Sequence, residues 1–191
     1  MVLAVVRHAH AGSKDRWLGD DRLRPLNGRG RREALALVGL LVPYRPRRVV
    51  SSPLVRCLQT IEPLATELGI TVETSETLGP QAGRGAARLL RALASGRHNV
   101  VVCTHGETIE ALQRELVQPG TLAFGPGGPH EKGSVWLLHA SAAQFTSAVY
   151  LPPCPPPGND RTAATADLEA RGPESRSALR PPLARPQARL Q

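Results

Sequence analysis

At 191 residues and 41% hydrophobic content, the chain is long enough to form one globular domain with a sizeable core. Its formal net charge is +8, and basic charge of this kind suits an acidic phosphate substrate. Aromatic residues make up only 3% of the chain and no nucleic-acid-binding motif is present, so binding to nucleic acid is not expected.

The apolar runs of the chain are far shorter than the roughly 18 residues that a membrane span needs. The first residues, Met1-Val2-Leu3, lack the basic start of a signal peptide. We therefore expect a cytoplasmic protein with no membrane association. The three cysteines have no metal-ligand spacing, and we expect Cys57 and Cys103 to be reduced, inert core residues.

The first predicted element is a buried strand over residues 2–6, an apolar run that stops at Arg7-His8. A charged loop follows. Asn27 is then a suitable N-cap for a helix over residues 28–42. We expect the apolar face of this helix to comprise Leu35, Val38, Leu41 and Val42.

The next strand, over residues 47–51, leads into a second helix, which is predicted over residues 53–68. Ser52 as the N-cap and Pro53 in the first helical position are both signals of a helix start. Arg56 then lies in the opening turn, where unpaired amides and the helix dipole favour an anion.

The remaining elements continue to alternate. In order, the sequence predicts a strand over 70–73, a helix over 86–94, a strand over 99–103, a helix over 107–117, a loop over 119–129 and a hairpin of 134–140 with 144–150. The strand at 99–103 stops at Thr104-His105-Gly106-Glu107, which brings a second histidine to a strand end.

Alternating strands and helices predict an α/β fold, a three-layer sandwich with a mostly parallel central sheet and helices on both faces. We assign residues 1–151 to this domain. Residues 152–191 contain nine prolines and almost no large apolar side chains, so we predict a disordered tail. A solvated linker is the preferred interpretation of its Pro-rich start, and a polyproline II ligand is the alternative.

The strand ends form a candidate site, because ligands of open α/β sheets bind beyond the carboxyl ends of the strands. Arg7, His8, Arg56 and His105 can meet there around one tetrahedral anion. A neutral imidazole is a competent nucleophile at phosphorus, and guanidinium groups match phosphate oxygens. Each residue alone could be structural, but the convergence of three strand ends favours catalysis.

Three motifs in this order resemble the histidine phosphatase superfamily, also called phosphoglycerate-mutase-like. They are Arg7-His8-Ala9, Ser52-Pro53-Leu54-Val55-Arg56-Cys57-Leu58-Gln59-Thr60 and Thr104-His105-Gly106-Glu107. Shorter segments are most similar to the small phosphohistidine-phosphatase type and to the histidine-phosphatase domain of Nudix-fused bacterial proteins. These segments are Ala11-Gly12-Ser13-Lys14, Gly19-Asp20-Asp21, Arg24-Pro25-Leu26 and Lys132-Gly133-Ser134-Val135-Trp136.

The resemblance implies that His8 becomes phosphorylated and that Arg7, Arg56 and His105 complete the phosphate pocket. Because side chains supply the positive charge, neither a metal ion nor another cofactor is expected. His8 and His10 lie two residues apart without nearby carboxylates, which is not the spacing of a zinc site. The other histidines are expected to be structural or solvated: His98, His130 and His139.

Two further cations and two carboxylates are candidates for the site. Lys14 stands where related mutases place a polar phosphate contact, and Arg24 is a second candidate for substrate binding. Many relatives supply a glutamate as proton donor after the third strand, but this sequence has Leu78-Gly79-Pro80 at that place. Glu76 and Glu107 are the candidates to replace it.

These expectations describe a metal-independent phosphatase that acts on a phosphoprotein, in particular phosphohistidine, or on a small phosphate ester. The missing acid favours a substrate with a good leaving group, such as phosphohistidine or a phosphoanhydride. Two alternatives stay open, phosphoglycerate-mutase-like phosphoryl transfer and a phosphate-binding module with weak catalysis. The phosphorylated substrate is the one partner predicted, and the sequence predicts no oligomeric state.

Overall fold

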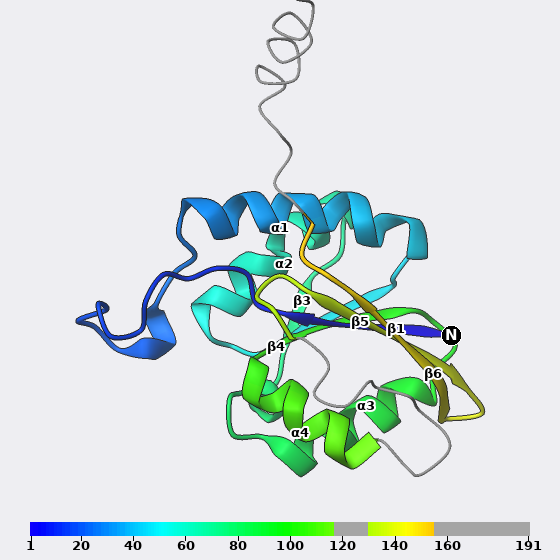
Figure 1. The fold of residues 1–191 in the computed structure, drawn as a ribbon. Coiled ribbons are helices and arrows are strands. Elements are labelled where there is room, and N and C mark those ends of the chain that lie inside the picture. The colour runs from blue at the N-terminus through cyan, green and yellow to red at the C-terminus, as the bar shows by residue number, and fades with distance from the viewer. Residues whose placement is uncertain (117–129, 155–191) are drawn as a thin grey trace, which may run out of the picture. The chain divides into compact units, whose positions relative to one another are not determined.

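A six-stranded sheet lies between two pairs of helices (Figure 1). The structure is a computed structural model, and it describes residues 1–116 and 130–154. The strands are β1 (Val2–Arg7), β2 (Arg48–Ser51), β3 (Val72–Thr74), β4 (Val100–Thr104), β5 (Val135–Ser141) and β6 (Gln144–Leu151). Their order is β3-β2-β4-β1-β5-β6, in which the first four are parallel and β5 and β6 are antiparallel to their neighbours.

Helices cover both faces of this sheet. The helices α1 (Gly28–Leu41) and α2 (Val55–Leu68) pack on one face, and α3 (Gly83–Ala94) and α4 (Gly106–Leu116) pack on the other. Three short 3-10 helices complete the described elements: η1 (Asp21–Leu23), η2 (Val42–Tyr44) and η3 (Glu76–Leu78).

The two halves of the core are separated by the alternation of side chains along the strands. In β1, Ala4 and Val6 pack with α1 and α2, whereas Leu3 and Val5 pack with α3 and α4. The neighbouring β4 divides its side chains in the same way. A strand buried on both faces must be apolar throughout, which explains why the first and fourth strands are unbroken apolar runs.

The predicted three-layer α/β sandwich is therefore confirmed. The described residues lie within one compact unit, Met1–Pro157. The predicted loop over 119–129 and the predicted tail from residue 155 onward lie outside the described residues. Within residues 1–116 and 130–154, no helix is long and apolar enough to cross a membrane.

Some local predictions were wrong. Helix α3 begins at Gly83 and not at residue 86, and β3 begins at Val72 and not at residue 70. Helix α2 begins at Val55, with Leu54 as a cap that makes no side-chain hydrogen bond, and not at Pro53. The reason is that the backbone of Leu54 is extended, with φ −69° and ψ 135°, so the first helical residue comes after it. In α1, Leu35 is 59% exposed and does not belong to the buried face.

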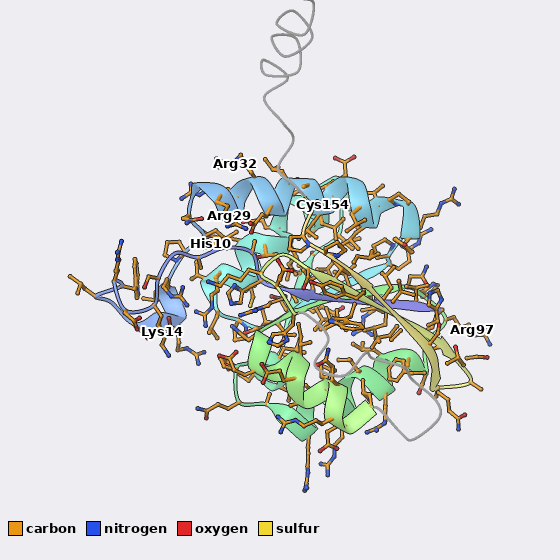
Figure 2. The ribbon with its side chains drawn as sticks, in the orientation of Figure 1. His10, Lys14, Arg29, Arg32, Arg97 and Cys154 are labelled. Atoms are coloured by element: carbon orange, nitrogen blue, oxygen red, sulfur yellow. The ribbon has the colours of Figure 1, made fainter. Side chains whose placement is uncertain are left out.

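The segment that joins β1 to α1 projects from the rest of the domain (Figure 1). Lys14 lies on the projecting part, whereas His10 lies close to the start of α1 (Figure 2). The segment ends at the predicted cap of α1, where the side chain of Asn27 accepts a hydrogen bond from the amide of Gly30 at 2.9 Å.

Candidate phosphate site

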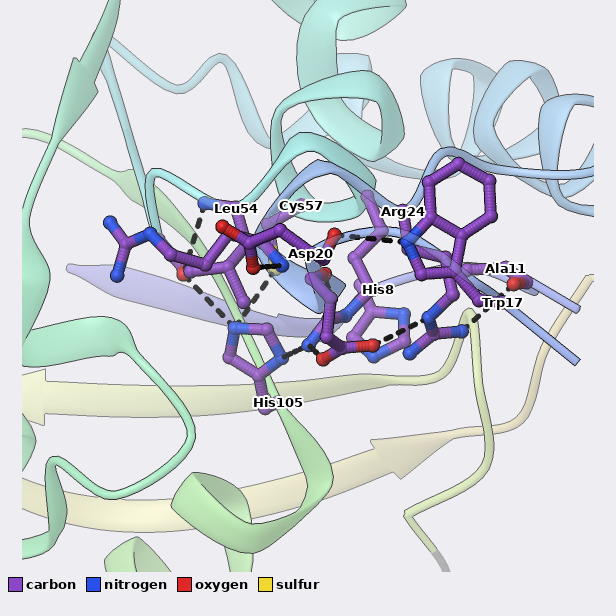
Figure 3. A network of polar contacts seen from close by, with 12 residues as sticks. His8, Ala11, Trp17, Asp20, Arg24, Leu54, Cys57 and His105 are labelled. Atoms are coloured by element: carbon purple, nitrogen blue, oxygen red, sulfur yellow. Dashed lines mark hydrogen bonds and ion pairs between the residues drawn. The ribbon is translucent and has the colours of Figure 1, made fainter. Parts of the chain in front are cut away.

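Two histidines meet where β1 and β4 end. The register pairs Arg7 with Thr104, and the backbone amide of His8 donates to the carbonyl of Thr104 at 3.0 Å. The next residue on each strand therefore reaches the same edge of the sheet. The rings of His8 and His105 lie edge to face, with their centroids 5.2 Å apart (Figure 3). Both rings are buried.

His8 is held as a neutral imidazole. Its Nδ1 lies 2.8 Å from the carbonyl oxygen of Ala9, and because that oxygen only accepts, Nδ1 carries the proton. Burial lowers the pKa of His8 to about 3, the hydrogen bond to Ala9 opposes this effect, and the positive charges of His105, Arg56 and Arg7 add to it. The other ring nitrogen, Nε2, therefore keeps its lone pair.

Arg56 reaches the site from the first turn of α2 and is only 3% exposed. Its Nη2 lies 3.4 Å from Nδ1 of His105, and its Nη1 donates to the backbone carbonyl of Asp21 at 2.7 Å. Its Nε is buried and has no hydrogen-bond partner among the described residues. A buried cationic N–H without an acceptor is a binding position for an anion.

Arg7 lies at the end of β1, against the first residue of α4. A Cβ atom on Gly106 would lie 2.9 Å from Cζ of Arg7, so only glycine allows this approach. Nη1 of Arg7 donates to the carbonyl of His130, and its Nε is buried without a partner within the described part of the chain. Burial lowers the pKa of Arg7, and the negative charges of Glu107 and Glu110 oppose this effect.

His105 is oriented by residues that precede and begin α2. Its Nε2 lies 3.0 Å from Oγ of Ser52 and 3.5 Å from Sγ of Cys57. Burial alone would raise the pKa of the Cys57 thiol, but hydrogen bonds to Cys103 and His105 and the charges of His105 and Arg56 lower it. Cys57 is a free, buried core residue, as the sequence predicts, and it is also a neighbour of the site.

Asp21 was not predicted as a site residue, and it links two arginines. One carboxylate oxygen lies 2.7 Å from Nε of Arg24, and the other lies 3.1 Å from Nη2 of Arg56. Burial would raise the pKa of Asp21, but the hydrogen bond from Arg24 and the charges of Arg56, Arg24 and Lys14 lower it. Asp21 is therefore an anion and a poor proton donor.

The other predicted substrate contacts lie beside the phosphate site. Lys14 and Asp21 line a pocket of about 480 Å³, which Glu76 and Gly79 also line. Arg24, in contrast, is buried and donates from Nη1 to the carbonyl of Ala11 at 2.8 Å. It lines a different pocket, together with Trp17 and Leu26.

Neither predicted proton donor contacts His8 or Arg56 among the described residues. Glu76 is exposed and pairs with Arg22 at 3.0 Å. Glu107 is exposed in the first turn of α4, on the side of Arg7. The backbone of the segment without the expected glutamate is held at the site, because Oγ1 of Thr104 donates to the carbonyl of Leu78 at 2.6 Å.

Five residues contribute to the site but were not predicted to do so from the sequence: Asp21, Ser52, Cys57, Gly106 and His130. All but His130 lie within segments whose resemblance to the family was already visible, so motif position was the available signal. His130 contributes its backbone carbonyl, which residue type does not reveal, and its ring pairs with Glu110 at 2.7 Å.

The described residues gather two imidazoles and two guanidinium groups with buried Nε atoms at one sheet edge, which is a set of groups suited to an oxyanion. In residues 1–116 and 130–154, no three His, Cys, Asp or Glu side chains form a group that could hold a metal ion. The guanidinium groups of Arg7 and Arg56 bring positive charge to the site.

Known proteins share this arrangement of sequence and fold. The family model of the histidine phosphatase superfamily (branch 1) matches residues 3–84. An 8-oxo-(d)GTP phosphatase of Mycolicibacterium smegmatis is 38% identical over 158 residues, which make up 78% of this chain and 47% of that protein. The chain thus spans about half the length of this curated relative.

Solved structures with the same fold include the protein histidine phosphatase SixA complexed with tungstate. It is 22% identical, with a TM-score of 0.65 over 82% of this chain and 97% of that chain. A mycobacterial glucosyl-3-phosphoglycerate phosphatase complexed with VO3 is 18% identical, with a TM-score of 0.59 over 75% of this chain and 95% of that chain. The family model thus shows that residues 3–84 are similar to the histidine phosphatase superfamily, and the solved structures share the fold of this chain.

Proposed function

We propose that the chain is a phosphatase that works through a phosphohistidine at His8 and needs no metal ion. The observation that carries the proposal is the position of the unprotonated Nε2 of His8 beside His105, in a site with the guanidinium groups of Arg7 and Arg56. The Nε atoms of Arg7 and Arg56 have no hydrogen-bond partner among the described residues, so a phosphate can supply the missing acceptors.

In the first step, Nε2 of His8 attacks phosphorus and the bond to the leaving group breaks. The moving phosphoryl group carries its charge on three equatorial oxygens, and Arg7, Arg56 and His105 hold that charge. The Nδ1–H bond to the carbonyl of Ala9 stabilises the positive ring that results. In the second step, water attacks the phosphohistidine, and orthophosphate leaves.

The leaving group must depart without strong protonation. Asp21 is held as an anion by two arginines, and Glu76 is exposed and paired with Arg22. A sugar or glycerate alkoxide would need a general acid, whereas the imidazole of phosphohistidine needs much less help. We therefore propose a phosphohistidine protein as the first candidate substrate.

A small phosphoanhydride is the second candidate substrate, because the relative of 38% identity is named for a nucleotide substrate. A phosphate leaving group also departs readily without a proton donor. Mutase-like transfer and phosphate binding with weak catalysis are the alternatives, and product analysis with 3-phosphoglycerate separates the mutase from a phosphatase.

The test is a His8→Ala variant, with His98→Ala as the matched control because His98 is exposed and lies away from the site. We expect His8→Ala to abolish hydrolysis of p-nitrophenyl phosphate and of a phosphohistidine peptide in the presence of EDTA, and His98→Ala to retain it. Wild-type protein quenched during turnover should carry acid-labile phosphate on His8. Normal turnover in folded His8→Ala refutes the proposal, and label that forms without turnover supports the binding module.

A further inference from the structure

A second pocket is lined by residues of the projecting segment, and no step proposed above uses it. Its volume is about 290 Å³, and its lining includes Trp17, Arg24, Pro25 and Leu26. Leu26 is 1% exposed and Arg24 is 7% exposed, so the floor of the pocket belongs to the ordered part of the domain. The pocket thus combines an aromatic side chain, apolar surface and a guanidinium group.

The indole of Trp17 is fixed in place although it is partly exposed. Its Nε1–H donates to the carbonyl of Asp20 at 2.9 Å (Figure 3). Gly19 lies close to the ring, because a Cβ atom at that position would be 3.3 Å from Cε2 and Nε1. The ring is still 37% exposed, although aromatic rings are usually buried. A ring held by its edge with free surface is a ready platform for stacking.

Arg24 connects this pocket to the phosphate site. Nε of Arg24 and Nη2 of Arg56 bind the two oxygens of the same Asp21 carboxylate, at 2.7 and 3.1 Å. The pocket edge and the phosphate site are therefore separated by a single carboxylate group. Lys14 also lies near Asp21, since its charge lowers the pKa of that residue. Arg24, Lys14 and Arg56 thus surround the Asp21 carboxylate, between the pocket and the phosphate site.

We infer that this pocket binds the base of a nucleoside diphosphate or triphosphate, which stacks on Trp17 while its terminal phosphate reaches His8. The inference rests on the proposed phosphatase function and chooses between its two substrate candidates. The leaving group of phosphohistidine is a neutral imidazole, which gains little from Lys14 and Arg24. The leaving group of a phosphoanhydride is an anion, and cations along its path stabilise it.

The reaction balances without further components. Nε2 of His8 forms a bond to the terminal phosphorus, and the bond from that phosphorus to the bridging oxygen breaks, with its electron pair staying on the shortened nucleotide. Water then attacks the phosphohistidine and releases its protons to the solvent, orthophosphate and neutral His8 are formed, and one anhydride bond has been hydrolysed.

Binding is tested by fluorescence of the full chain carrying His8→Ala, with GDP as the probe. The chain has two tryptophans, and Trp136 is only 4% exposed, so quenching reports on Trp17. We expect GDP to quench the emission and inorganic pyrophosphate to leave it unchanged. Adding Trp17→Phe should remove most of the change. No quenching by GDP, or the same quenching by pyrophosphate, overturns the inference.

Turnover separates this inference from the proposed function. Stacking of one base on an aromatic ring strengthens binding. Trp17→Ala should therefore lower the ratio of kcat/KM for GDP to kcat/KM for p-nitrophenyl phosphate by about tenfold. Leu18→Ala is the matched control, because Leu18 is fully exposed on the same segment and does not line the pocket, and it should leave the ratio unchanged.

Hydrolysis of p-nitrophenyl phosphate without hydrolysis of GDP overturns the nucleotide inference and leaves the phosphatase standing. A faster reaction with a phosphohistidine peptide than with any nucleotide also overturns it and assigns a protein substrate. Loss of hydrolysis of all these compounds refutes the phosphatase itself. An equal loss for GDP and p-nitrophenyl phosphate in Trp17→Ala shows that Trp17 is only structural.

Discussion

The guanidinium of Arg7 lies directly against the backbone of Gly106. A Cβ atom at Gly106 would approach Cζ of Arg7 to 2.9 Å and its Nη2 to 3.0 Å. The glycine after the second histidine therefore has a specific task, which is to let α4 begin where Arg7 must lie. The motif Thr104-His105-Gly106 joins the second imidazole to the position of the first guanidinium.

We predict that Gly106→Ala lowers activity far more than stability. The long side chain of Arg7 can move aside, so the fold tolerates the methyl group, but the guanidinium leaves its position. A displacement of about 1 Å at a catalytic group lowers the rate by about a hundredfold, which should appear in kcat/KM for p-nitrophenyl phosphate. Gly39→Ala is the control, because its Cβ has no neighbour within 4 Å, and it should keep full activity. Full activity in Gly106→Ala would show that Arg7 has no role in catalysis.

Much of the fold follows from local signals in the sequence. The apolar runs at β1 and β4 predicted buried strands, and Asn27 predicted the start of α1, because burial on both faces and capping depend on neighbouring residues. The exposed position of Leu35 did not follow, because the buried face of α1 contains Glu33. The carboxylate of Glu33 binds the backbone amide of His10 at 2.9 Å, a partner that periodicity cannot reveal.

The site residues that could be predicted are those whose position follows from a single sequence motif. Arg7, His8 and His105 each end a strand, and parallel neighbours end at the same edge. Asp21 was missed because its role depends on a contact with Arg56, which lies in a distant segment. The start of α2 was misplaced because the backbone stays extended at Leu54, although Pro53 suits a first helical position.

The low pKa of His8 gives a prediction for stability against pH. The pKa is about 3 in the folded protein and 6.5 in the unfolded chain, so between these values the unfolded chain binds the extra proton. The contribution of the neutral His8 ring to the free energy of unfolding is therefore complete above pH 6.5, and it falls as the pH drops toward 3. When the pH is lowered from 7.5 to 5, the free energy of unfolding of the wild type should fall by about 2 kcal/mol more than that of His8→Asn. Urea unfolding at both pH values measures this, and equal losses in the two proteins would show that His8 is not held neutral.

The packing of α1 on the segment after β1 gives a prediction for stability alone. A Cβ atom at Gly30 would lie 2.1 Å from the backbone oxygen of His10, and a backbone group cannot rotate away. We expect Gly30→Ala to lower the free energy of unfolding by about 3 kcal/mol, as overpacking does. Gly28→Ala is the matched control in the same turn. A Cβ atom at Gly28 would lie 3.9 Å from its closest neighbour, the flexible side chain of Arg32. Equal stability of the two variants would mean that α1 can shift away from His10.

The carboxylate of Asp21 binds one N–H donor each of Arg24 and Arg56 near the phosphate position. Removing its charge should therefore have opposite effects on phosphate binding and on catalysis. In Asp21→Asn, Arg56 loses the charge of a carboxylate 3.1 Å from Nη2, so inorganic phosphate should inhibit at a concentration a few-fold lower. The same change frees Arg24 and Arg56 to move, so kcat should fall by about tenfold. Asp15→Asn makes the same charge change at an exposed position of the same segment and controls for the overall field. Weaker inhibition by phosphate in Asp21→Asn, with kcat unchanged, would show that the carboxylate does not compete with phosphate for Arg56.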